Sequence, residues 1–551
     1  MKYVIIGGVA AGAGAAARIR RLDEKAEIVI FERGEFISFA NCGLPYHVGG
    51  VIEDRGDLLV MPKPKFAAWF NTDIRTNQCA TEIHRDKKTV TITPKDGNAY
   101  EESYDKLLIA TGSHPSSINI PGGDLPQIQS LWNIPDMDRI IRGITARAKH
   151  VIVIGGGFIG LETAENLLNR GLKVTLIEQS DHILPTVDAE MAILLTEEMQ
   201  RLGVRMMFNQ NIVKFEQTDD GRITAVLQSG ERITADHIIS SVGVRPNSEL
   251  AAQAGLTLGK RGHIHVNEHL QTSDPDIYAA GDVIEVISPI THTPTAVPLA
   301  GPANKQARIA ADNMTGRSNS SYRFSYGTSV IKIGKLTSAS VGITEQALKS
   351  TGETNYLKIY IHPATHATYY PGGTALHIKF IFRKDGTILG GQIIGESGAD
   401  KRVDTIAVAM RYGLKAYDLA EFELAYAPPF NSAKDPVNFL GMIAQDIRDG
   451  LTEVVTPDNI PEDALLIDVR KADEIAEFGA IPKAINIPIE TLRDHLSELD
   501  PKKLLIMTCR VGRRAYIAER ILKQHGFRVK NLSGGFLTWK QMQNANALQK
   551  S

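Results

Sequence analysis

The chain opens with the stretch Tyr3-Val4-Ile5-Ile6-Gly7-Gly8-Val9-Ala10-Ala11-Gly12. Its apolar start predicts a buried strand, its glycines predict a tight turn, and residues 13–22 predict a helix, after which a second strand ends at Glu32. In such a βαβ unit the glycines let the backbone approach a pyrophosphate, and a carboxylate about 20 residues further on accepts from a ribose hydroxyl. Glu32 has that spacing from Gly12, although Val9 stands where the G-x-G-x-x-G pattern has its second glycine.

A second copy of the pattern is complete. Residues 150–154 predict a strand, Gly155-Gly156-Gly157-Phe158-Ile159-Gly160 has every glycine of the fingerprint, and residues 161–169 predict a helix. The next strand, 173–177, leads to Glu178 at a similar spacing. Two units predict two dinucleotides, a flavin and a nicotinamide, because a hydride has to pass between them. A carboxylate at Glu178 suits a free ribose 2′-hydroxyl and repels a 2′-phosphate, which favours NADH, with NADPH as the alternative.

Composition excludes several classes of protein. At 551 residues the chain is long enough for three or four domains, and 61 Lys and Arg against 63 Asp and Glu leave no basic footprint for nucleic acid. No run of eighteen apolar residues could span a membrane. The three cysteines are too few and too scattered for a disulfide framework or a metal site, so we expect no metal and a cytoplasmic protein.

The stretch Ser38-Phe39-Ala40-Asn41-Cys42-Gly43-Leu44-Pro45-Tyr46 follows the first βαβ unit. Cys42 precedes helix-breaking residues, which leave it free to face a neighbouring group, so it is a candidate reactive thiol. The alternative is a small buried apolar residue. No second cysteine lies four or five residues away, so a disulfide partner has to come from a ligand or from a distant part of the chain.

Two further stretches complete a family pattern. They are Leu107-Leu108-Ile109-Ala110-Thr111-Gly112 and Thr272-Ser273-Asp274-Pro275-Asp276-Ile277-Tyr278-Ala279-Ala280-Gly281-Asp282. With them the chain resembles, over residues 1–449, the pyridine nucleotide-disulfide oxidoreductases, whose flavin domain is interrupted by the nicotinamide domain. The resemblance implies that Asp282 holds the flavin ribitol. The implied FAD and NADH contacts are Gly7, Gly8, Val9, Ala10, Ala11, Gly12, Glu32, Arg33, Asn41, Ala110, Thr111, Gly112, Gly155, Gly157, Phe158, Ile159, Gly160, Glu178, Gly243, Gly281, Asp282, Pro298 and Ala300.

Within that family the chain is most similar to the coenzyme A-disulfide reductases. It lacks the C-x4-C of the two-cysteine members and the histidine that peroxidases and oxidases carry at a position corresponding to residues 9–11. The resemblance implies that one cysteine, Cys42, cycles between a thiolate and a mixed disulfide with coenzyme A. It also implies that coenzyme A contacts Arg18, Arg21, Ser38, Phe39, Asn41, Asn304 and Lys434. For Arg18 and Arg21, which lie three residues apart on one helix, the alternative interpretation is a solvent-exposed surface.

The same resemblance implies a homodimer with shared active sites. Residues 322–447 have the pattern of the family's dimerisation domain, and the tyrosines that match Tyr369 and Tyr426 reach the cysteine of the partner subunit. Each tyrosine taken alone is as well explained by packing or by turn chemistry.

The C-terminal part resembles a single rhodanese domain. Residues 465–470 and 504–508 predict strands, and the second delivers Cys509 into a loop before a helix that starts at Ala515. The loop residues are Cys509, Arg510, Val511, Gly512, Arg513 and Arg514. A helix N-terminus and arginines favour a thiolate and attract an anionic sulfur donor. A cysteine phosphatase would need C-x5-R, whereas Arg514 gives C-x4-R; a degenerate domain kept for binding would not need the cysteine.

The implied fold is α/β, with two Rossmann-like dinucleotide-binding domains arranged as in glutathione reductase, an α+β dimerisation domain and a rhodanese-like α/β domain. The predicted boundaries are 1–149 and 271–321 for the FAD domain, 150–270 for the NAD(P)H domain, 322–449 for the dimerisation domain, 450–461 for a linker and 462–551 for the rhodanese domain.

The implied activity is reduction of coenzyme A disulfide, coenzyme A persulfide or polysulfide by NADH through FAD and Cys42, with sulfane sulfur handled by Cys509. Two alternatives stay open. One is an NADH oxidase or peroxidase, and the other is a sulfur or redox sensor that acts through the rhodanese domain.

Overall fold

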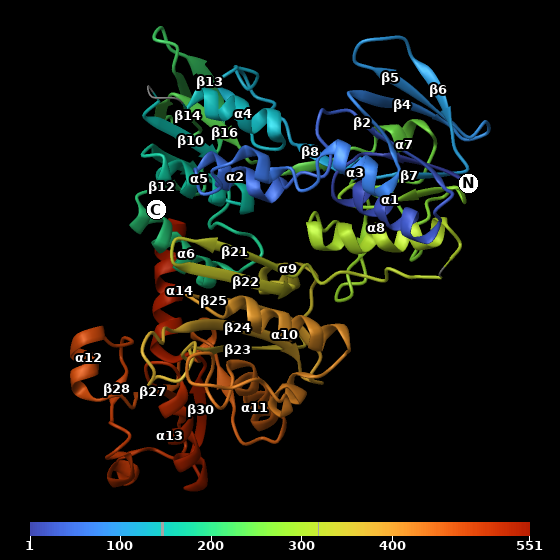
Figure 1. Cartoon of the computed structure of the whole chain (residues 1–551). Helices are drawn as coiled ribbons and strands as arrows, with labels where there is room; N and C mark the ends of the chain where they lie inside the picture. The colour runs from blue at the N-terminus through green and yellow to red at the C-terminus, as the bar shows by residue number, and fades with distance from the viewer. Residues whose placement is uncertain (145–147, 318, 551) are drawn as a thin grey trace. The chain divides into compact units, whose positions relative to one another are not determined.

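The computed structural model (Figure 1) describes residues 1–144, 148–317 and 319–550, except for the side chain of residue 550. The chain forms two compact units. Unit 1 comprises Met1–Ile177 and Asn211–Gly327, and unit 2 comprises Glu178–Gln210 and the described residues from Thr328 onward.

Unit 1 contains the two predicted βαβ units. The first lies in a parallel sheet of order β18-β7-β1-β2-β3, and helix α1 packs against α8. The bounds are β1 (Lys2–Ile6), α1 (Ala10–Leu22), β2 (Glu27–Glu32), β3 (Asp73–Thr76), β7 (Lys106–Ile109), β18 (Ile277–Ala279) and α8 (Ala300–Met314). The strands read as apolar runs because helices cover a parallel sheet on its faces.

The second βαβ unit lies in another parallel sheet, where β11, β10, β16 and β9 are neighbours in that order. The bounds are β9 (Ile128–Ser130), α4 (Ile134–Gly143), β10 (His150–Ile154), α5 (Phe158–Asn169), β11 (Lys173–Ile177) and β16 (His237–Ser240). Both first helices begin earlier than predicted, at Ala10 and at Phe158, because Val9 and Gly157 are their N-cap residues.

Smaller elements complete unit 1. Two antiparallel three-stranded sheets are formed by β4-β5-β6 and by β13-β14-β15, and β8 pairs with β17. The bounds are α2 (Leu44–Val48), α3 (Lys63–Phe70), β4 (Gln78–His84), β5 (Thr89–Pro94), β6 (Tyr100–Ser103), β8 (Ser113–Pro115), β13 (Ile212–Gln217), β14 (Ile223–Leu227), β15 (Arg232–Ala235), β17 (Val244–Pro246), α7 (Glu249–Gln253), β19 (Val286–Ile287) and β20 (Pro294–Thr295).

Unit 2 contains an antiparallel sheet of order β21-β22-β25-β24-β23, with α10 packed on β22 and β25. The bounds are α6 (Ala189–Leu202), β12 (Arg205–Met207), β21 (Ser329–Ile333), β22 (Leu336–Gly342), α9 (Glu345–Ser350), β23 (Tyr356–Ile361), β24 (Leu376–Arg383), β25 (Ile388–Gly395), α10 (Ala399–Arg411) and α11 (Pro436–Arg448). The elements from β21 to α11 lie within residues 322–449, the range predicted for the dimerisation domain.

Unit 2 also contains a parallel sheet of order β26-β30-β29-β27-β28, and its last helix α14 packs against α6. The bounds are β26 (Val454–Val455), β27 (Leu465–Asp468), α12 (Ala472–Phe478), β28 (Ile485–Asn486), β29 (Leu504–Thr508), α13 (Arg513–Gln524), β30 (Arg528–Leu532) and α14 (Gly535–Lys550). The predicted linker 450–461 is wrong at Val454–Val455, because these residues form the edge strand of this sheet. A strand of two residues is too short to show a period in the sequence.

Candidate active site

The first glycine turn has the shape that a pyrophosphate site needs. Gly7 has a φ of +104°, and a Cβ at Gly7 would lie 2.2 Å from the carbonyl oxygen of Ala110. A Cβ at Gly12 would lie 1.7 Å from the Gly7 oxygen, so both positions require glycine. Val9 is tolerated as the N-cap residue of α1, and no described side chain caps that helix, so its first amides can face an anion.

Three segments that are far apart in the sequence meet at this turn. Ala110 contacts it as described above, and a Cβ at Gly281 would lie 3.2 Å from the Cβ of Ala11. Glu32 accepts hydrogen bonds from the N–H groups of Gly8 and Gly34, both at 2.8 Å, which holds its carboxylate beside the turn. These residues fit the pyrophosphate and ribose of a flavin dinucleotide.

Asp282, the predicted ribitol residue, follows directly after Gly281. Burial raises the pKa of its carboxyl, and Ser113 Oγ donates a hydrogen bond of 3.0 Å to it. Thr111 Oγ1 donates to the oxygen of Asn247 at 2.7 Å, and Gly112 has a φ of +65°. A carboxylate at this position can accept hydrogen bonds from hydroxyl groups, which fits a ribitol chain. Arg33, Pro298 and Ala300 are exposed at the ends of their elements.

The second glycine turn fits a dinucleotide more directly. Gly155 has a φ of +100°, and a Cβ at Gly160 would lie 1.9 Å from the Gly155 oxygen. A Cβ at Gly157 would meet no described atom within 4 Å, so this position is open for a phosphate to approach the backbone. Phe158 and Ile159 begin α5 and are half-buried, and Gly243 has a φ of +96°. Glu178, directly after β11, accepts from the N–H of Ser180 at 2.7 Å.

Cys42 is exposed and lies in a short 3-10 helix, Asn41–Gly43, directly before α2. The N–H of Ser38 donates to the oxygen of Gly8 at 2.9 Å, which attaches the cysteine's stretch to the first glycine turn. Ser38 has a φ of +45°, an uncommon conformation for serine, and this bend turns the chain toward the cysteine. Phe39 and Asn41 are half-buried, and Asn41 Nδ2 donates to the oxygen of Trp132 at 3.4 Å.

The surroundings of Cys42 disfavour its thiolate. Although the residue is exposed, the protein atoms around its sulfur partly desolvate the thiol and raise its pKa, and the negative charges of Glu162 and Asp282 raise it further. These side chains therefore do not stabilise the Cys42 thiolate.

Glu162 is a site residue that the sequence reasoning missed. Burial raises the pKa of this α5 carboxyl to about 7, and Tyr46 OH donates to Glu162 Oε1 at 3.1 Å. Tyr46 belongs to α2, which packs against α5, so the pair lies close to Cys42. The available signal was a glutamate on the predicted helix two residues after the last fingerprint glycine.

The predicted coenzyme A residues are only partly brought together. Arg18 Nε donates to Asp312 Oδ1 of α8 at 2.6 Å, so its charge is already balanced. Arg21 is exposed, and its Nε donates to the oxygen of Ala17 on its own helix. Asn304 lies on α8 beside α1, because a Cβ at Gly14 would lie 3.5 Å from its Oδ1. Lys434, in unit 2, is exposed.

The two predicted tyrosines do meet. Tyr369 OH and Tyr426 OH lie 2.6 Å apart in unit 2, and the residues are 73% and 47% exposed. The hydrogen bond to Tyr426 raises the pKa of the Tyr369 hydroxyl. Each hydroxyl can donate and accept a hydrogen bond, so this exposed pair can also bind a polar group of another molecule.

Cys509 is fully buried at the end of β29, where its Sγ accepts from the N–H of Gly512 at 3.2 Å. The three arginines of its loop differ. Arg514 forms a two-pronged ion pair with Glu474 of α12, at 2.5 and 2.6 Å, and this pair raises the pKa of Arg514. The guanidinium of Arg510 lies 4.2 Å from the ring centroid of Phe478, and Arg513 is exposed. The sequence reasoning did not identify Glu474.

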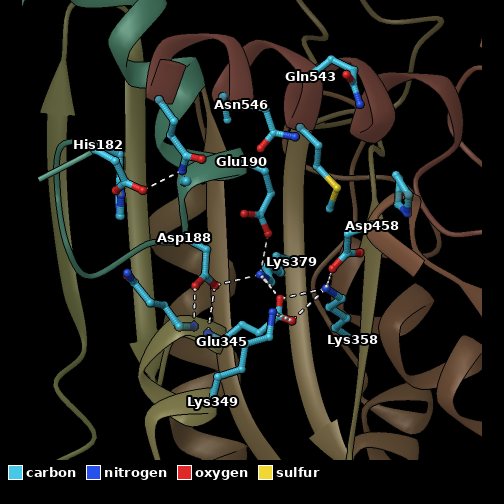
Figure 2. A pocket seen from close by; sticks show the side chains of 17 residues that line it. His182, Asp188, Glu190, Glu345, Lys349, Lys358, Lys379, Asp458, Gln543 and Asn546 are labelled. Carbon is cyan, nitrogen blue, oxygen red and sulfur yellow. Dashed lines mark hydrogen bonds and ion pairs between the residues drawn. The ribbon is translucent and has the colours of Figure 1, made fainter. Parts of the chain in front are cut away.

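Three carboxylates converge elsewhere in unit 2, in a cavity of about 310 Å³ (Figure 2). Lys379 lies among them, with its Nζ 2.9 Å from Asp188, 2.5 Å from Glu190 and 2.7 Å from Glu345. The lysine ammonium thus supplies the positive charge that these carboxylates require.

No helix in residues 1–144, 148–317 or 319–550 is both long and apolar enough to cross a membrane.

Family models match three parts of the chain. The family model of the pyridine nucleotide-disulphide oxidoreductases matches residues 1–307, that of their dimerisation domain matches 328–436, and that of the rhodanese-like domain matches 456–542. The coenzyme A disulfide reductase of Staphylococcus epidermidis is 35% identical over 446 residues, which are 81% of this chain and 100% of the relative.

Two solved structures are similar over nearly the whole chain. The reduced CoADR-RHD of Bacillus anthracis is 44% identical, with a TM-score of 0.95 and 98% of each chain covered. The NAD-dependent persulfide reductase of A. fulgidus is 37% identical, with a TM-score of 0.91, and covers 98% of this chain and 100% of its own. The chain therefore belongs to the pyridine nucleotide-disulphide oxidoreductases, in the coenzyme A disulfide reductase group that carries a C-terminal rhodanese-like domain.

Proposed function

We propose that this protein uses NADH, with NADPH as the second option, to reduce coenzyme A disulfide, coenzyme A persulfide or polysulfide at Cys42. The observation that carries the proposal is an exposed thiol whose stretch is hydrogen-bonded to the first glycine turn through Ser38 and Gly8. The similarity to a coenzyme A disulfide reductase and to a persulfide reductase supports the substrate class.

Two dinucleotides would be held by residues already described. The turn of Gly7 to Gly12, Glu32 and Asp282 fit FAD, and the turn of Gly155 to Gly160 fits the pyrophosphate of NADH. The sequence spacing predicts Glu178 as the ribose contact. When bound, the flavin would accept a hydride from NADH and pass an electron pair on to sulfur.

Cys42 acts as the nucleophile. Its thiolate attacks one sulfur of the substrate S–S bond, that bond breaks, and the leaving thiolate takes up a proton while a disulfide between Cys42 and the remaining group forms. Two electrons and a proton then release the second thiol and restore the Cys42 thiolate. Glu162, with a pKa of about 7, and its partner Tyr46 lie near enough to influence the charge at this sulfur.

Coenzyme A would be held along α1 and α8. Arg18, Arg21 and Asn304 would contact its phosphates and adenosine, and Arg18 would exchange Asp312 for a phosphate. Ser38, Phe39 and Asn41 would flank the pantetheine thiol. Lys434 and the hydroxyl pair of Tyr369 and Tyr426 would come from the partner subunit of a homodimer, because family members complete the site in this way.

Cys509 would accept sulfane sulfur as a persulfide and pass it to coenzyme A or to Cys42. The Gly512 N–H and the arginines of the loop favour binding of an anionic donor. We also propose the domain boundaries predicted from the sequence and a cytoplasmic location for this protein.

The oxidase or peroxidase alternative is less favourable, because residues 9–11 hold no histidine next to the sulfur site. The sensor alternative predicts slow turnover with every sulfur substrate.

The test is steady-state NADH consumption by the purified flavoprotein with coenzyme A disulfide, coenzyme A persulfide and peroxide as substrates. We expect turnover with one or both coenzyme A substrates, loss of that turnover in Cys42→Ser, and wild-type turnover in the matched control Cys79→Ser. Full activity of Cys42→Ser, or rapid turnover with peroxide alone, would refute the proposal. Cys509→Ser should lose the use of an external sulfane donor while it keeps coenzyme A disulfide reduction.

A further inference from the structure

The loop that carries Cys509 is backed by the turn at Ser533 and Gly534 and by the first residues of α14; residues 533–537 together are called the second loop. The N–H of Phe536 donates to the oxygen of Cys509 at 2.8 Å, and the N–H of Leu537 donates to the oxygen of Arg510 at 3.0 Å. A Cβ at Gly535 would lie 2.3 Å from the Cys509 oxygen, so the two loops are in close backbone contact. The second loop therefore sets the position of the backbone from which the Cys509 thiol projects.

The same second loop is attached to the antiparallel sheet of unit 2. Ser533 Oγ accepts from the N–H of Tyr360 at 2.8 Å and donates to the oxygen of Tyr360 at 3.4 Å. Tyr360 lies on β23, the edge strand of that sheet, so Ser533 satisfies backbone groups that a neighbouring strand would otherwise take. A Cβ at Gly534 would lie 2.8 Å from the Cβ of Tyr360. Both Ser533 and Tyr360 are buried.

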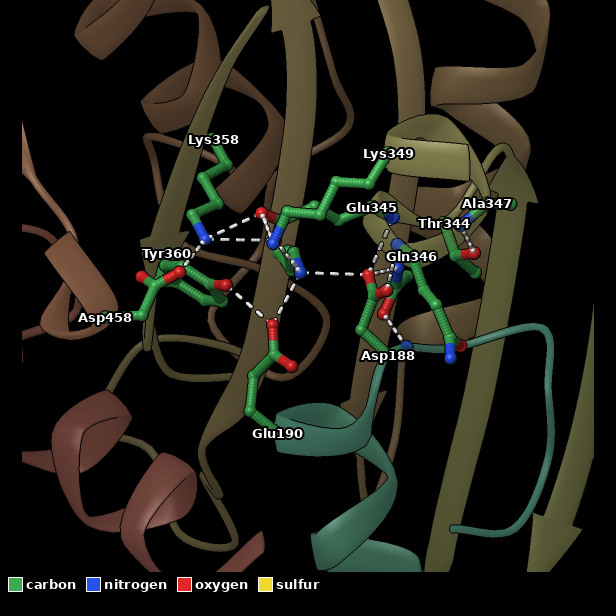
Figure 3. A network of polar contacts seen from close by, with 12 residues as sticks. Asp188, Glu190, Thr344, Glu345, Gln346, Ala347, Lys349, Lys358, Tyr360 and Asp458 are labelled. Carbon is green, nitrogen blue, oxygen red and sulfur yellow. Dashed lines mark hydrogen bonds and ion pairs between the residues drawn. The ribbon is translucent and has the colours of Figure 1, made fainter. Parts of the chain in front are cut away.

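Tyr360 is in turn fixed by charged groups (Figure 3). Its hydroxyl donates to Glu190 Oε1 at 2.6 Å, and Lys379 Nζ lies 5.5 Å from its ring centroid. Lys379 binds Glu190 and two further carboxylates, as Figure 2 shows. Tyr360 cannot shift without disturbing a buried ion cluster, which makes it a rigid support for the loop.

We propose that Ser533 and Tyr360 are positioning residues for Cys509, so that the dimerisation-type sheet sets the geometry of the rhodanese loop. The inference rests on the proposed role of Cys509 in sulfur transfer. If the second loop is displaced, the Cys509 backbone moves relative to the Gly512 N–H group, from which Cys509 Sγ accepts a hydrogen bond. That hydrogen bond then weakens, and the sulfur becomes a poorer nucleophile.

The test reaction is sulfur transfer from thiosulfate to cyanide by the full-length flavoprotein. The Cys509 thiolate attacks the outer sulfur of thiosulfate, the S–S bond breaks, and sulfite leaves with the bonding electron pair. Cyanide then takes the outer sulfur from the Cys509 persulfide, which yields thiocyanate and restores the thiolate. No external reductant is required.

The main variant is Ser533→Ala, with Thr491→Ala as the matched control, because the Thr491 hydroxyl bonds to Pro488 within the rhodanese-like region. We expect Ser533→Ala to lower kcat for sulfur transfer by about tenfold with KM for thiosulfate little changed, as loss of two buried hydrogen bonds at a positioning residue implies. Ser533→Thr, which keeps the hydroxyl, should restore kcat. NADH-dependent reduction at Cys42 should be unchanged in all three variants.

A second pair of variants tests the support behind the loop. Tyr360→Phe removes the hydroxyl bond to Glu190, and Tyr356→Phe removes the bond of 3.1 Å to Glu345 from the same strand without contact to the second loop. The alkylation rate of Cys509, followed by mass spectrometry of its peptide, should fall in Ser533→Ala and, to a smaller extent, in Tyr360→Phe, but not in Tyr356→Phe.

The inference is overturned if Ser533→Ala behaves as Thr491→Ala does, if Ser533→Thr fails to restore kcat, or if sulfur transfer and NADH-dependent reduction fall together. If the wild-type protein transfers no sulfur from thiosulfate, that result counts against the proposed function of Cys509. The alkylation rates still decide the positioning inference in that case, because alkylation needs no sulfur donor.

Discussion

Cys42 and Cys509 have the same side chain, but the residues around them give the two thiols different properties. Cys42 is exposed and has the carboxylates of Glu162 and Asp282 near it, whereas Cys509 is buried and receives a backbone N–H. Negative charge disfavours a thiolate, and a donated hydrogen bond favours one. Neither setting follows from the residue types next to each cysteine in the chain.

The Glu162 carboxylate should control the reactivity of Cys42 in a pH-dependent way. Because the pKa of Glu162 is raised to about 7, the residue is largely neutral at pH 6 and charged at pH 8. Its charge raises the pKa of Cys42, so Glu162→Gln should alkylate at Cys42 severalfold faster than wild type at pH 8 and at nearly the same rate at pH 6.

The measurement is the alkylation rate of the Cys42 peptide between pH 6 and pH 9. Glu165→Gln is the control, since it removes a like charge from the same helix that is not among the causes of the Cys42 shift; it lowers the pKa of Glu162, so it should move the pH dependence of alkylation to lower pH without removing it. An equal effect of both variants, or a Glu162→Gln effect that is the same at pH 6 and pH 8, would contradict the assignment.

At the scale of single elements, the two glycine turns are fixed by close backbone contacts. The fingerprint glycines predicted both turns because a Cβ at Gly12 or Gly160 would overlap a carbonyl oxygen of the preceding strand end. The pattern could not place the helix starts to better than a few residues, because helix ends depend on which residue becomes the cap.

Gly157 and Gly160 should respond differently to the same substitution. Gly157→Ala adds a methyl group that meets no described atom within 4 Å, so the protein should fold with an unchanged melting temperature while KM for NADH rises about tenfold. Gly160→Ala forces the Gly155 carbonyl to move and should lower the melting temperature by several degrees. Thermal unfolding and NADH titration check both, and a Gly157→Ala protein with normal NADH affinity would contradict a nucleotide at this turn.

The ion pair between α1 and α8 should oppose coenzyme A binding. If Arg18 has to leave Asp312 to reach a phosphate, Asp312→Asn should lower KM for coenzyme A disulfide severalfold, and Arg18→Gln should raise it. The expected change lies in KM and not in kcat, because a phosphate contact is made equally in the ground state and in the transition state. A rise in KM for Asp312→Asn would show that Arg18 acts from its observed position.

At the scale of the whole molecule, Lys379 joins parts of unit 2 that are far apart in the sequence. It binds Asp188 and Glu190 at the start of α6 and Glu345 at the start of α9. Burial alone would raise the pKa of Glu345, but the charges of Lys379 and Lys358 hold it well below its ordinary value. The stabilisation is therefore kept through mild acid and is lost only as the pH falls through that lowered pKa.

Removal of the Lys379 charge should be costly. Lys379→Met removes the ammonium that contacts all three carboxylates and leaves Lys358 and Lys349 as partners of Glu345 alone, so it should destabilise unit 2 by about 3–5 kcal/mol at neutral pH. The deficit should shrink as the pH falls, because desolvated carboxylates that have lost their counter-ion take up protons at a higher pH than they do in the wild-type protein. Lys349→Met, which removes a 59% exposed partner of Glu345, should cost less than about 1 kcal/mol. Thermal unfolding at several pH values separates the two, and equal costs would contradict the buried cluster.

Much of the site was accessible from the sequence. The fingerprints predicted the two dinucleotide units, Cys42 and Cys509 were recognised from the breakers and strands around them, and Tyr369 and Tyr426 were chosen by resemblance. Arg18 stays a predicted phosphate contact, and its ion pair with Asp312 was not foreseen; Glu162 and Glu474 were missed. The sequence does not show which distant side chain will lie opposite a charged residue on a helix.

The sequence by itself determined the order of elements and the two glycine turns, because strand periodicity and backbone sterics are local and act within about thirty residues. Only the tertiary structure decided the partners of the charged residues and the attachment of the Cys509 loop to β23 through Ser533. Hydrogen bonds and ion pairs depend on distances of about 3 Å between side chains, and those distances are set by packing of elements that lie hundreds of residues apart.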